Sequence, residues 1–272
     1  MVYVICVLIG IVTAFVGSLV GLGGGVILVP TMLFLYQYTE LFSWATPQTI
    51  VGISLIAMVF TALSSTIYYS RNGRVDYKTG LLFLTGSIPG GFIGSWLNQY
   101  VSTDDFSLYF GFLMIVLSLL FLIRRKTAMK GITETNKSFQ TFHIDGKTYY
   151  YTVAIWQAFS LSLVVGMLSG LFGIGGGSVI VPAMILLFGI PAHIATATSM
   201  FMIFFVSMVS AGTHIALGHI AWEYALFFIP GAYIGGTIGA KANQLFQGKT
   251  LERILRILLI VIGIRLIMEG LI

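Results

Sequence analysis

The stretch GLGGGVILVP at Gly21–Pro30 returns as GIGGGSVIVP at Gly173–Pro182. Each copy sets a glycine cluster inside a long apolar run and follows it with a short β-branched segment that ends in proline. Glycine lacks a Cβ atom and proline lacks an amide proton, so we expect a helix to break at either cluster and to leave backbone N–H groups without helical partners. Inside a membrane such a break is tolerated only where protein or a water-filled cavity surrounds it.

Composition places the chain in a membrane. Of its 272 residues, 57% are hydrophobic and 8% are charged, whereas soluble proteins carry about 25% charged residues. The apolar runs are long and continuous rather than short alternations, which favours a helix bundle over an outer-membrane barrel. Cys6 is the only cysteine, which excludes an intramolecular disulfide and a cysteine metal cage. We expect an all-α polytopic protein of the cell membrane, surrounded by the lipid bilayer.

The apolar runs divide into two transmembrane repeats joined by a polar segment. Residues 2–37 are too long for one straight span yet short for two full ones, so we expect a bent hairpin of two shortened helices, repeated at 152–189. Three continuous spans follow each hairpin, at 49–70, 78–98 and 106–123 and at 193–217, 222–241 and 253–268. The predicted domains are a first repeat at 1–124, a cytoplasmic linker at 125–150 and a second repeat at 151–272.

The two repeats align residue by residue. A shift of 152 positions matches seven of the twelve residues of Gly21–Met32 with Gly173–Met184. A shift of 145 positions matches Ser54 with Ser199, and then seven of the fourteen residues of Gly86–Gln99 with Gly231–Gln244. The difference between the shifts falls in the connection after the hairpin, where a loop absorbs it. The chain is therefore a tandem duplication.

Basic residues predict the orientation of the spans, because cytoplasmic loops carry an excess of Lys and Arg. The connection at 71–78 is basic and thus inside, whereas its counterpart at 216–223 has no Lys or Arg and is thus outside. We therefore expect inverted repeats, each with an odd number of crossings, and both termini outside. The net charge of +5 does not indicate a nucleic-acid partner, since these charges lie where orientation signals belong. Thirteen of the fourteen Lys and Arg residues are inside in this arrangement: Arg71, Arg74, Lys78, Arg124, Arg125, Lys126, Lys130, Lys137, Lys147, Lys241, Lys249, Arg253 and Arg256.

The linker contains one structural signal. Asp145-Gly146 lies between the β-rich flanks Phe142-His143-Ile144 and Lys147–Tyr150. Asp-Gly in this setting is typical of a two-residue β-hairpin turn. We expect a small cytoplasmic β-hairpin that serves as a connector.

Enzyme, nucleotide and metal motifs are missing from the sequence. Neither glycine cluster ends in Gly-Lys-Ser/Thr, and neither fits Gly-x-Gly-x-x-Gly after a soluble strand. No His-Glu-x-x-His or Gly-x-Ser-x-Gly motif occurs, and the histidines near the membrane have no close carboxylate in sequence. We expect no catalytic residue, no metal and no cofactor. An intramembrane enzyme or a receptor-like membrane scaffold is the alternative class of function.

The glycine clusters offer positive electrostatic potential instead. The short helix after each cluster begins near Val26 or Ser178, and the free N–H groups of its first turn favour an anion. Such breaks in both halves indicate the substrate site of a transporter near the bilayer midplane. Hydroxyl and amide groups at the entry to the next span would complete it. The candidate substrate-binding residues are Gly23, Gly24, Gly25, Val26, Gln48, Ser54, Gly175, Gly176, Gly177, Ser178, His193, Thr198 and Ser199.

A packing role is the alternative reading of the glycines. Small residues at four-residue spacing let transmembrane helices approach closely. We assign this role to the unbroken stripes Gly86, Gly90 and Gly94 and Gly231, Gly235 and Gly239, and we assign the anion role to the clusters.

The whole chain resembles the sulfite exporter TauE/SafE family. The resemblance rests on the Gly-x-Gly-Gly-Gly-x5-Pro-like stretch of each half, on Ala195–Ser199, on the Gly-Gly-x-x-Gly helices and on the Asp-Gly-Lys linker. It implies a plasma-membrane permease for a sulfur-containing anion such as sulfite, sulfoacetate or another organosulfonate. The first half has Thr49–Ser54 where the family pattern resembles Ala-x-x-Thr-Ser. Members of the family differ in the anion they move and in the direction of transport, and the resemblance implies no particular oligomeric state.

Overall fold

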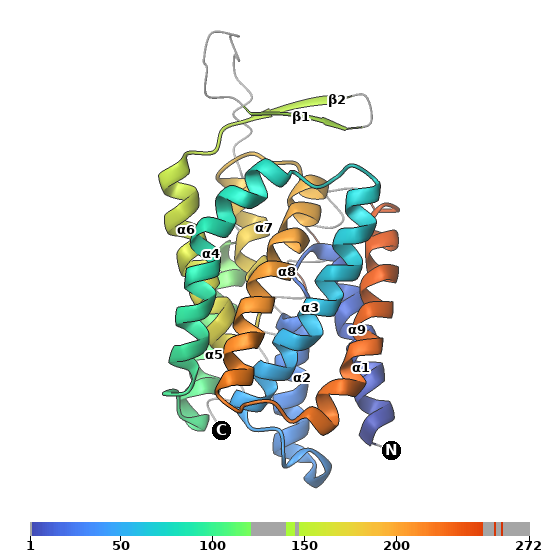
Figure 1. The fold of residues 1–272 in the computed structure, drawn as a ribbon, viewed down its shortest axis with the longest axis vertical. Helices are drawn as coiled ribbons and strands as arrows, with labels where there is room; N and C mark the ends of the chain where they lie inside the picture. The colour runs from blue at the N-terminus through green and yellow to red at the C-terminus, as the bar shows by residue number, and fades with distance from the viewer. Residues whose placement is uncertain (1, 121–139, 145–146, 247–252, 254–256, 258–272) are drawn as a thin grey trace.

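The protein is a bundle of helices with a β-hairpin at one end (Figure 1). The computed structural model describes residues 2–120, 140–144, 147–246, 253 and 257. Within that part the elements are α1 (Val2–Val20), α2 (Gly25–Tyr38), η1 (Glu40–Phe42), α3 (Pro47–Arg71), α4 (Tyr77–Asn98), α5 (Thr103–Leu120), β1 (Gln140–Ile144), β2 (Lys147–Tyr151), α6 (Ile155–Phe172), α7 (Gly177–Leu186), α8 (Ala192–Ala216) and α9 (Trp222–Asn243). The span predicted at 253–268 lies outside the described residues, apart from two positions.

Both predicted helix breaks are confirmed. The first hairpin consists of α1 and the short α2, and the second consists of α6 and the shorter α7. The chain between the helices adopts positive φ angles at Gly21, Gly23 and Gly24 and again at Gly173, Gly175 and Gly176. Residues with side chains rarely adopt this left-handed region. The glycines therefore turn the chain at the same three points in both copies.

The two longest helices form the centre of the bundle. In α3 and α8, 72% of the most apolar window is buried, compared with 39% in α1 and α6. By length and composition, α1, α3, α4, α6 and α8 are each able to cross a membrane. Thr46 caps α3 by accepting a hydrogen bond from the Thr49 amide, and Pro47 follows it in the first turn, where its missing N–H costs nothing.

Each half packs its first helix against the other half. Helix α1 lies along α9, and α6 lies along α4. The glycine stripes make these contacts: a Cβ atom on Gly90 would lie 2.2 Å from the Leu163 carbonyl oxygen, and one on Gly235 would lie 2.2 Å from that of Ile11. The packing role predicted for the stripes is confirmed, because only glycine permits backbones this close.

Two equivalent asparagines, Asn98 and Asn243, join the ends of these helices. The Asn98 amide donates to the Leu171 carbonyl over 2.7 Å, and the Asn243 amide donates to the Leu19 carbonyl over 2.6 Å. Both asparagines hold the last turn of a first helix, immediately before its glycine cluster. The bundle is thus assembled by exchange between halves rather than as two separate domains.

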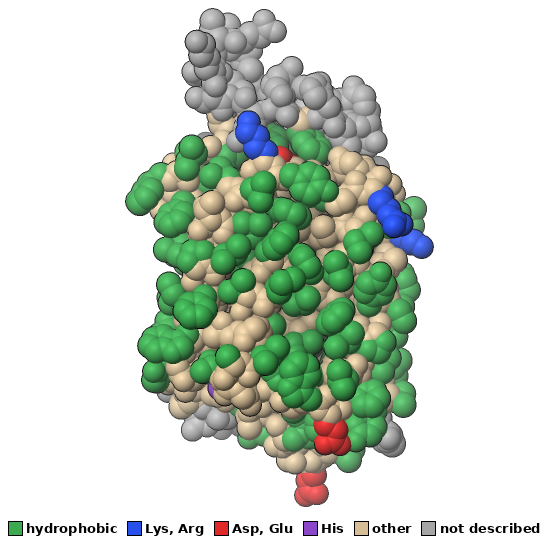
Figure 2. Space-filling view, in the orientation of Figure 1, with side chains coloured by type: hydrophobic (Ala, Val, Ile, Leu, Met, Phe, Trp, Pro, Cys, Tyr) green, Lys and Arg blue, Asp and Glu red, His purple; other side chains and the backbone are tan. Residues whose placement is uncertain are grey.

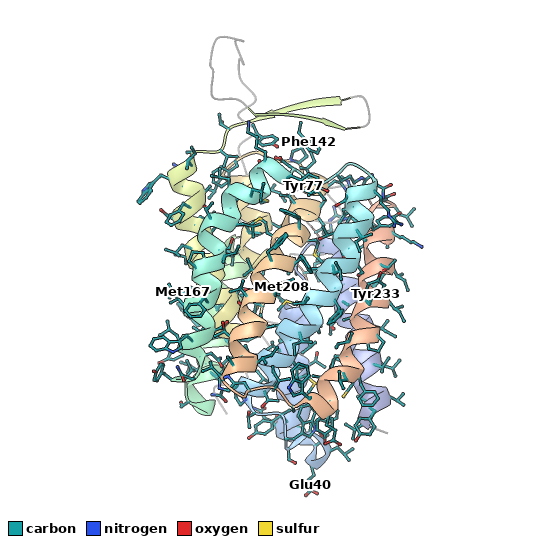
Figure 3. All side chains as sticks on the ribbon, in the orientation of Figure 1. Glu40, Tyr77, Phe142, Met167, Met208 and Tyr233 are labelled. Atoms are coloured by element: carbon teal, nitrogen blue, oxygen red, sulfur yellow. The ribbon has the colours of Figure 1, made fainter. Side chains whose placement is uncertain are left out.

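The outer surface suits a bilayer. Figure 2 shows hydrophobic side chains over the middle of the visible face, with Lys and Arg side chains toward the hairpin end. Arg71 ends α3 and Lys241 lies in the last turn of α9, whereas Glu223 lies in the first turn of α9. Figure 3 places Glu40 at the end opposite to Phe142 of the hairpin. The apolar belt with charges at its ends is the pattern of a multi-pass membrane protein.

The equivalent helices α1 and α6 begin at opposite ends of the bundle. In Figure 1 the N-terminus lies at the lower end beside α1, and α6 begins at the upper end beneath the hairpin. The first helices of the two halves, α1 and α6, therefore run in opposite directions through the bundle.

The strands of the predicted β-hairpin are present as β1 and β2, which pair antiparallel from Gln140 with Tyr151 to Ile144 with Lys147, whereas the predicted Asp145-Gly146 turn lies outside the described residues. The hydroxyl of buried Tyr151 donates to the Asp76 carboxylate, and the Asp76 amide donates to Thr198 Oγ1 over 3.0 Å. Burial, and then the hydrogen bond to Asp76, raise the pKa of Tyr151 above its ordinary value of 10.0. The hairpin is thus fastened to the start of α4.

Candidate functional site

The two glycine clusters touch each other in the interior of the bundle. A Cβ atom on Gly25 would lie 2.0 Å from the Gly173 carbonyl oxygen, and one on Gly177 would lie 2.2 Å from the Gly21 carbonyl oxygen. The end of each cluster therefore meets the beginning of the other, and the two segments cross in antiparallel fashion. Backbone approaches backbone here with no room for a side chain.

Two equivalent serines hold this crossing. Ser54 on α3 donates to the Gly173 carbonyl over 2.8 Å, and Ser199 on α8 donates to the Gly21 carbonyl over 2.9 Å. Both side chains are fully buried. The duplication predicted that these serines are equivalent, and the structure adds that each binds the cluster of the opposite half.

Apolar side chains fill the middle of the crossing. A Cβ atom on Gly23 would lie 3.1 Å from Ile203 Cγ2 and 3.2 Å from Met58 Sδ, and one on Gly175 would lie 2.4 Å from Met58 Sδ. Met58 and Ile203 are related by the 145-position shift. Sequence reasoning missed both, since an apolar residue in an apolar span carries no signal of its own.

The starts of α2 and α7 differ in polarity. Gly24 caps α2 with φ 98°, and Gly176 caps α7 with φ 67°. The residue after the first glycine of each helix is Val26 in α2 but Ser178 in α7, and the Ser178 hydroxyl is fully buried without a hydrogen-bond partner among the described residues. The second half alone therefore adds a side-chain donor to the helix start.

A cavity of about 10 Å³ lies beside the start of α7. Its walls include Gly175, Gly176, Ser87 of α4 and Ser169 of α6. The Ser169 hydroxyl is buried and has no hydrogen-bond partner in the described part of the chain. By the 152-position shift its counterpart is Gly17. The sequence analysis did not predict Ser169 as a site residue, because it has no serine counterpart in the first half and a lone serine in a membrane helix is usually bonded to its own backbone.

Of the remaining candidates, Gln48, His193 and Thr198 lie toward the ends of the bundle, and Val26 lies in the first turn of α2. Gln48 donates to the Val101 carbonyl over 2.9 Å, and His193 Nδ1 lies 3.3 Å from Asn243 Oδ1. Thr198 holds the Asp76 amide at the start of α4, and Val26 is buried in α2. These four side chains take part in packing and capping contacts, whereas Gly23, Gly24, Gly25, Gly175, Gly176, Gly177, Ser54 and Ser199 come together at the crossing.

A histidine pair stands at the end of the bundle opposite to the hairpin. His214 Nδ1 lies 3.0 Å from His219 Nδ1, and His214 Nε2 lies 3.4 Å from the Gly170 carbonyl. Burial lowers the pKa of His219, in the loop after α8, below its ordinary value of 6.5. Among the described residues no three His, Cys, Asp or Glu side chains are grouped as metal ligands.

Comparison with known proteins gives the family. The model of the family described as "Sulfite exporter TauE/SafE" matches residues 6–266. A protein of Bacillus subtilis named "Probable membrane transporter protein YunE" is 46% identical over 270 residues, which cover 98% of each chain. A "Probable membrane transporter protein" of Xylella fastidiosa is 26% identical over 95% of this chain and 92% of its own length. No solved structure matches significantly.

Such coverage takes in nearly all of both repeats. The relatives are named as membrane transporters, in agreement with a function other than catalysis. With its apolar spans, its broken helices and this near-complete match, the chain is a multi-pass membrane transporter that belongs to the sulfite exporter TauE/SafE family.

Proposed function

We propose that this protein is a secondary carrier or facilitator that moves a small sulfur-containing anion, such as sulfite, sulfoacetate or another organosulfonate, across the cell membrane. The anion binds near the crossing of the glycine clusters, and the first turn of α7 supplies its main contacts. The family name supports the chemical class of the substrate.

One observation carries the site: polar hydrogen-bond donors converge at the start of α7 in an otherwise apolar interior. The start of a helix carries a partial positive charge that favours an anion. In α7 the amides of Gly177 and Val179 already donate to the Gly175 and Gly176 carbonyls, over 2.8 and 3.2 Å, so side-chain donors matter here. Gly175, Gly176 and Ser169 line the cavity, and Ser178 lies in the first turn of α7 next to it in sequence. Neither serine hydroxyl has a hydrogen-bond partner among the described residues, so the two add two donors. Sulfonate and sulfite oxygens are acceptors, so this donor set matches them.

The size of the cavity favours a carrier over an open channel. A cavity of about 10 Å³ holds roughly one water molecule. A sulfur oxyanion enters it only when the surrounding helices move apart. Binding is then coupled to movement of the helices, which is the requirement for alternating access.

Inverted insertion of the two halves is part of the proposal. Opposite starting ends of α1 and α6 and the basic residues gathered toward the hairpin end support it. The hairpin end is then cytoplasmic, and the end with Glu40 and Glu223 faces outside. Export of an anion from a negative interior gains about 2.3 kcal/mol per charge for each 100 mV.

Transport by purified protein tests the proposal. Proteoliposomes should take up labelled sulfite or sulfoacetate faster than protein-free liposomes, and an imposed membrane potential should change the rate in the direction of the anion's charge. Binding or chemical turnover of these anions without flux would instead support the intramembrane enzyme or receptor class.

A pair of serine variants tests the site. Ser178→Ala removes one hydroxyl donor and should weaken anion binding by roughly tenfold, the effect of about 1.4 kcal/mol. Ser64→Ala is the matched control, because the Ser64 hydroxyl is buried but donates to the Thr61 carbonyl of its own helix, 3.0 Å away. Equal affinity of Ser178→Ala and the parent protein, measured by calorimetry, would place the site elsewhere.

A further inference from the structure

Duplication gives the bundle two equivalent three-helix contacts. One lies between α4, α6 and α8 and is here called the α4–α6–α8 seam; the other lies between α9, α1 and α3 and is called the α1–α3–α9 seam. Residues of the two seams are related by the 145- and 152-position shifts. The two seams have the same backbone packing, so a difference between their side chains is informative.

In the α1–α3–α9 seam, the hydroxyls of Ser18, Ser65 and Tyr69 are bonded to one another or to the backbone. Ser18 Oγ lies 2.6 Å from Ser65 Oγ, and both hydroxyls reach the Gly236 carbonyl, at 2.8 and 3.2 Å. The Tyr69 hydroxyl donates to the Ser18 carbonyl over 3.0 Å. This seam is closed by its own hydrogen bonds.

In the α4–α6–α8 seam, Ser87 and Ser162 donate to carbonyls of their own helices, but four other serines are not bonded in this way. Ser95, Ser169, Ser207 and Ser210 are each fully buried, and none of their hydroxyls has a hydrogen-bond partner among the described residues. Ser210 Oγ would lie 2.8 Å from a Cβ atom on Gly91, and Ser95 Oγ would lie 2.7 Å from one on Gly170. These two hydroxyls therefore point between the helices rather than toward lipid.

Stability does not account for four such serines. A buried hydroxyl without a partner costs free energy, and the usual remedy in a membrane helix is a bond to the carbonyl three or four residues earlier. Ser65 adopts that remedy by donating to the Thr61 carbonyl over 2.6 Å. Ser210, its counterpart, does not. Free donors in one seam are better explained by a polar solute that passes there.

The α4–α6–α8 seam also connects the proposed site with one end of the molecule. Its inner limit is the cavity lined by Ser87, Ser169 and Gly176. Its other limit is the pair His214 and His219, where His214 Nε2 lies 3.4 Å from the Gly170 carbonyl. Ser207, Ser210 and His214 follow at spacings of three and four on α8, so they share one face of that helix.

We propose that the α4–α6–α8 seam is the path between the cavity beside α7 and the outer face, with the α1–α3–α9 seam as its sealed counterpart toward the inner face. The seryl hydroxyls donate in turn to the oxygens of the moving anion, and the histidine pair closes the outer end. The identity of the solute and the assignment of the outer face rest on the proposed function; the course of the path along the α4–α6–α8 seam does not.

Cysteine accessibility tests the path. Ser210→Cys and its equivalent Ser65→Cys are made in a Cys6→Ala background, so that each protein has one thiol. The probe is the membrane-impermeant anion 2-sulfonatoethyl methanethiosulfonate, whose sulfenyl sulfur is attacked by the thiolate to form a mixed disulfide with release of methanesulfinate. We expect Ser210→Cys to react with probe added outside, and Ser65→Cys, which lies in the sealed seam, to react with probe added on neither side.

The outcomes separate the two proposals. Failure of Ser210→Cys to react from outside, or reaction of Ser65→Cys from outside, overturns the path whether or not the protein transports sulfur anions. Outside labelling of Ser210→Cys in a protein that moves neither sulfite nor sulfoacetate keeps the path and overturns the substrate class. Sulfoacetate should slow the labelling; sulfite is unsuitable as a competitor because it consumes the probe.

Alanine variants of the same pair give a second measurement. Ser65→Ala breaks a bonded cluster and should lower the melting temperature. Ser210→Ala removes an unpartnered hydroxyl and should leave the melting temperature equal or higher, while the transport rate falls about tenfold, as for loss of one bond to a charged group. A fall in melting temperature with unchanged transport in Ser210→Ala would show a structural serine and overturn the path.

Discussion

Individual serine hydroxyls form hydrogen bonds between the two halves of the chain. Ser54 and Ser199 each bind a carbonyl oxygen of the opposite glycine cluster, over 2.8 and 2.9 Å. Without these bonds, the Gly21 and Gly173 carbonyl groups would lose a hydrogen-bond donor in a region that excludes water. The two serines thus stabilise the crossing of the glycine clusters in equivalent ways.

Removal of either serine hydroxyl should therefore lower the stability of the protein by a similar amount. Ser54→Ala and Ser199→Ala should each lower the free energy of unfolding by about 1 kcal/mol, the usual contribution of one buried hydrogen bond. Thr213→Ala is the control, since the Thr213 hydroxyl donates to the Val209 carbonyl within its own helix. Denaturant titration in detergent measures the three values. No loss in either serine variant would mean that the crossing is held by backbone contact alone.

At the scale of elements, glycine has two distinct uses. In the clusters it turns the chain through positive φ angles, and in α4 and α9 it brings helices together. Gly212 on α8 belongs to neither group, because a Cβ atom there would have nothing within 4 Å. The chain therefore contains its own control for the packing role.

Alanine substitutions should separate these positions. Gly90→Ala places a Cβ atom 2.2 Å from the Leu163 carbonyl oxygen, so α4 and α6 must separate and the protein should lose stability and yield. Gly212→Ala should be neutral or stabilising, since alanine is favoured over glycine in a helix by about 0.5–1 kcal/mol. Thermal unfolding of the two purified variants compares them. Equal melting temperatures would refute the packing role.

The β-hairpin should stabilise the protein in a pH-dependent manner. The pKa of Tyr151 is raised in the folded protein, so its bond to Asp76 contributes fully below pH 10 and is lost as the pH rises above it. Tyr151→Phe should lower the melting temperature at pH 8, and the difference from the parent should shrink toward pH 11. A difference that stays constant over this range would exclude the Asp76 bond as its source.

The sequence predicted the helices and their breaks better than it predicted the contacts between helices. The glycine and proline positions predicted both hairpins, and the repeat predicted that Ser54 matches Ser199. It did not predict that α1 packs on α9 and α6 on α4, because a packing stripe names no partner. The free hydroxyls of Ser169 and Ser210 were missed for a related reason: whether a hydroxyl is bonded depends on atoms of other helices.

The whole molecule combines two similar halves into an asymmetric interior. The crossing of the glycine clusters is nearly symmetric, but Ser178 and Ser169 correspond to Val26 and Gly17 in the first half, and Ser210 lacks, among the described residues, the hydrogen bonds that its equivalent Ser65 makes. In the proposed inverted arrangement, the two halves have the same fold and are inserted in opposite directions. Their different polar residues are then what would allow one side to bind while the other is sealed.

The orientation of the halves is the central claim, and one labelling experiment tests it most directly. Asn72 and Leu217 are equivalent by the 145-position shift, and each lies at the C-terminal cap of its helix without a positive φ angle. Asn72→Cys and Leu217→Cys, made separately in the Cys6→Ala background, are exposed to an impermeant thiol reagent on intact cells. The inverted arrangement predicts that Leu217→Cys reacts at once and that Asn72→Cys reacts only after the membrane is permeabilised. Reaction of both cysteines from the same side would show parallel halves and contradict the account.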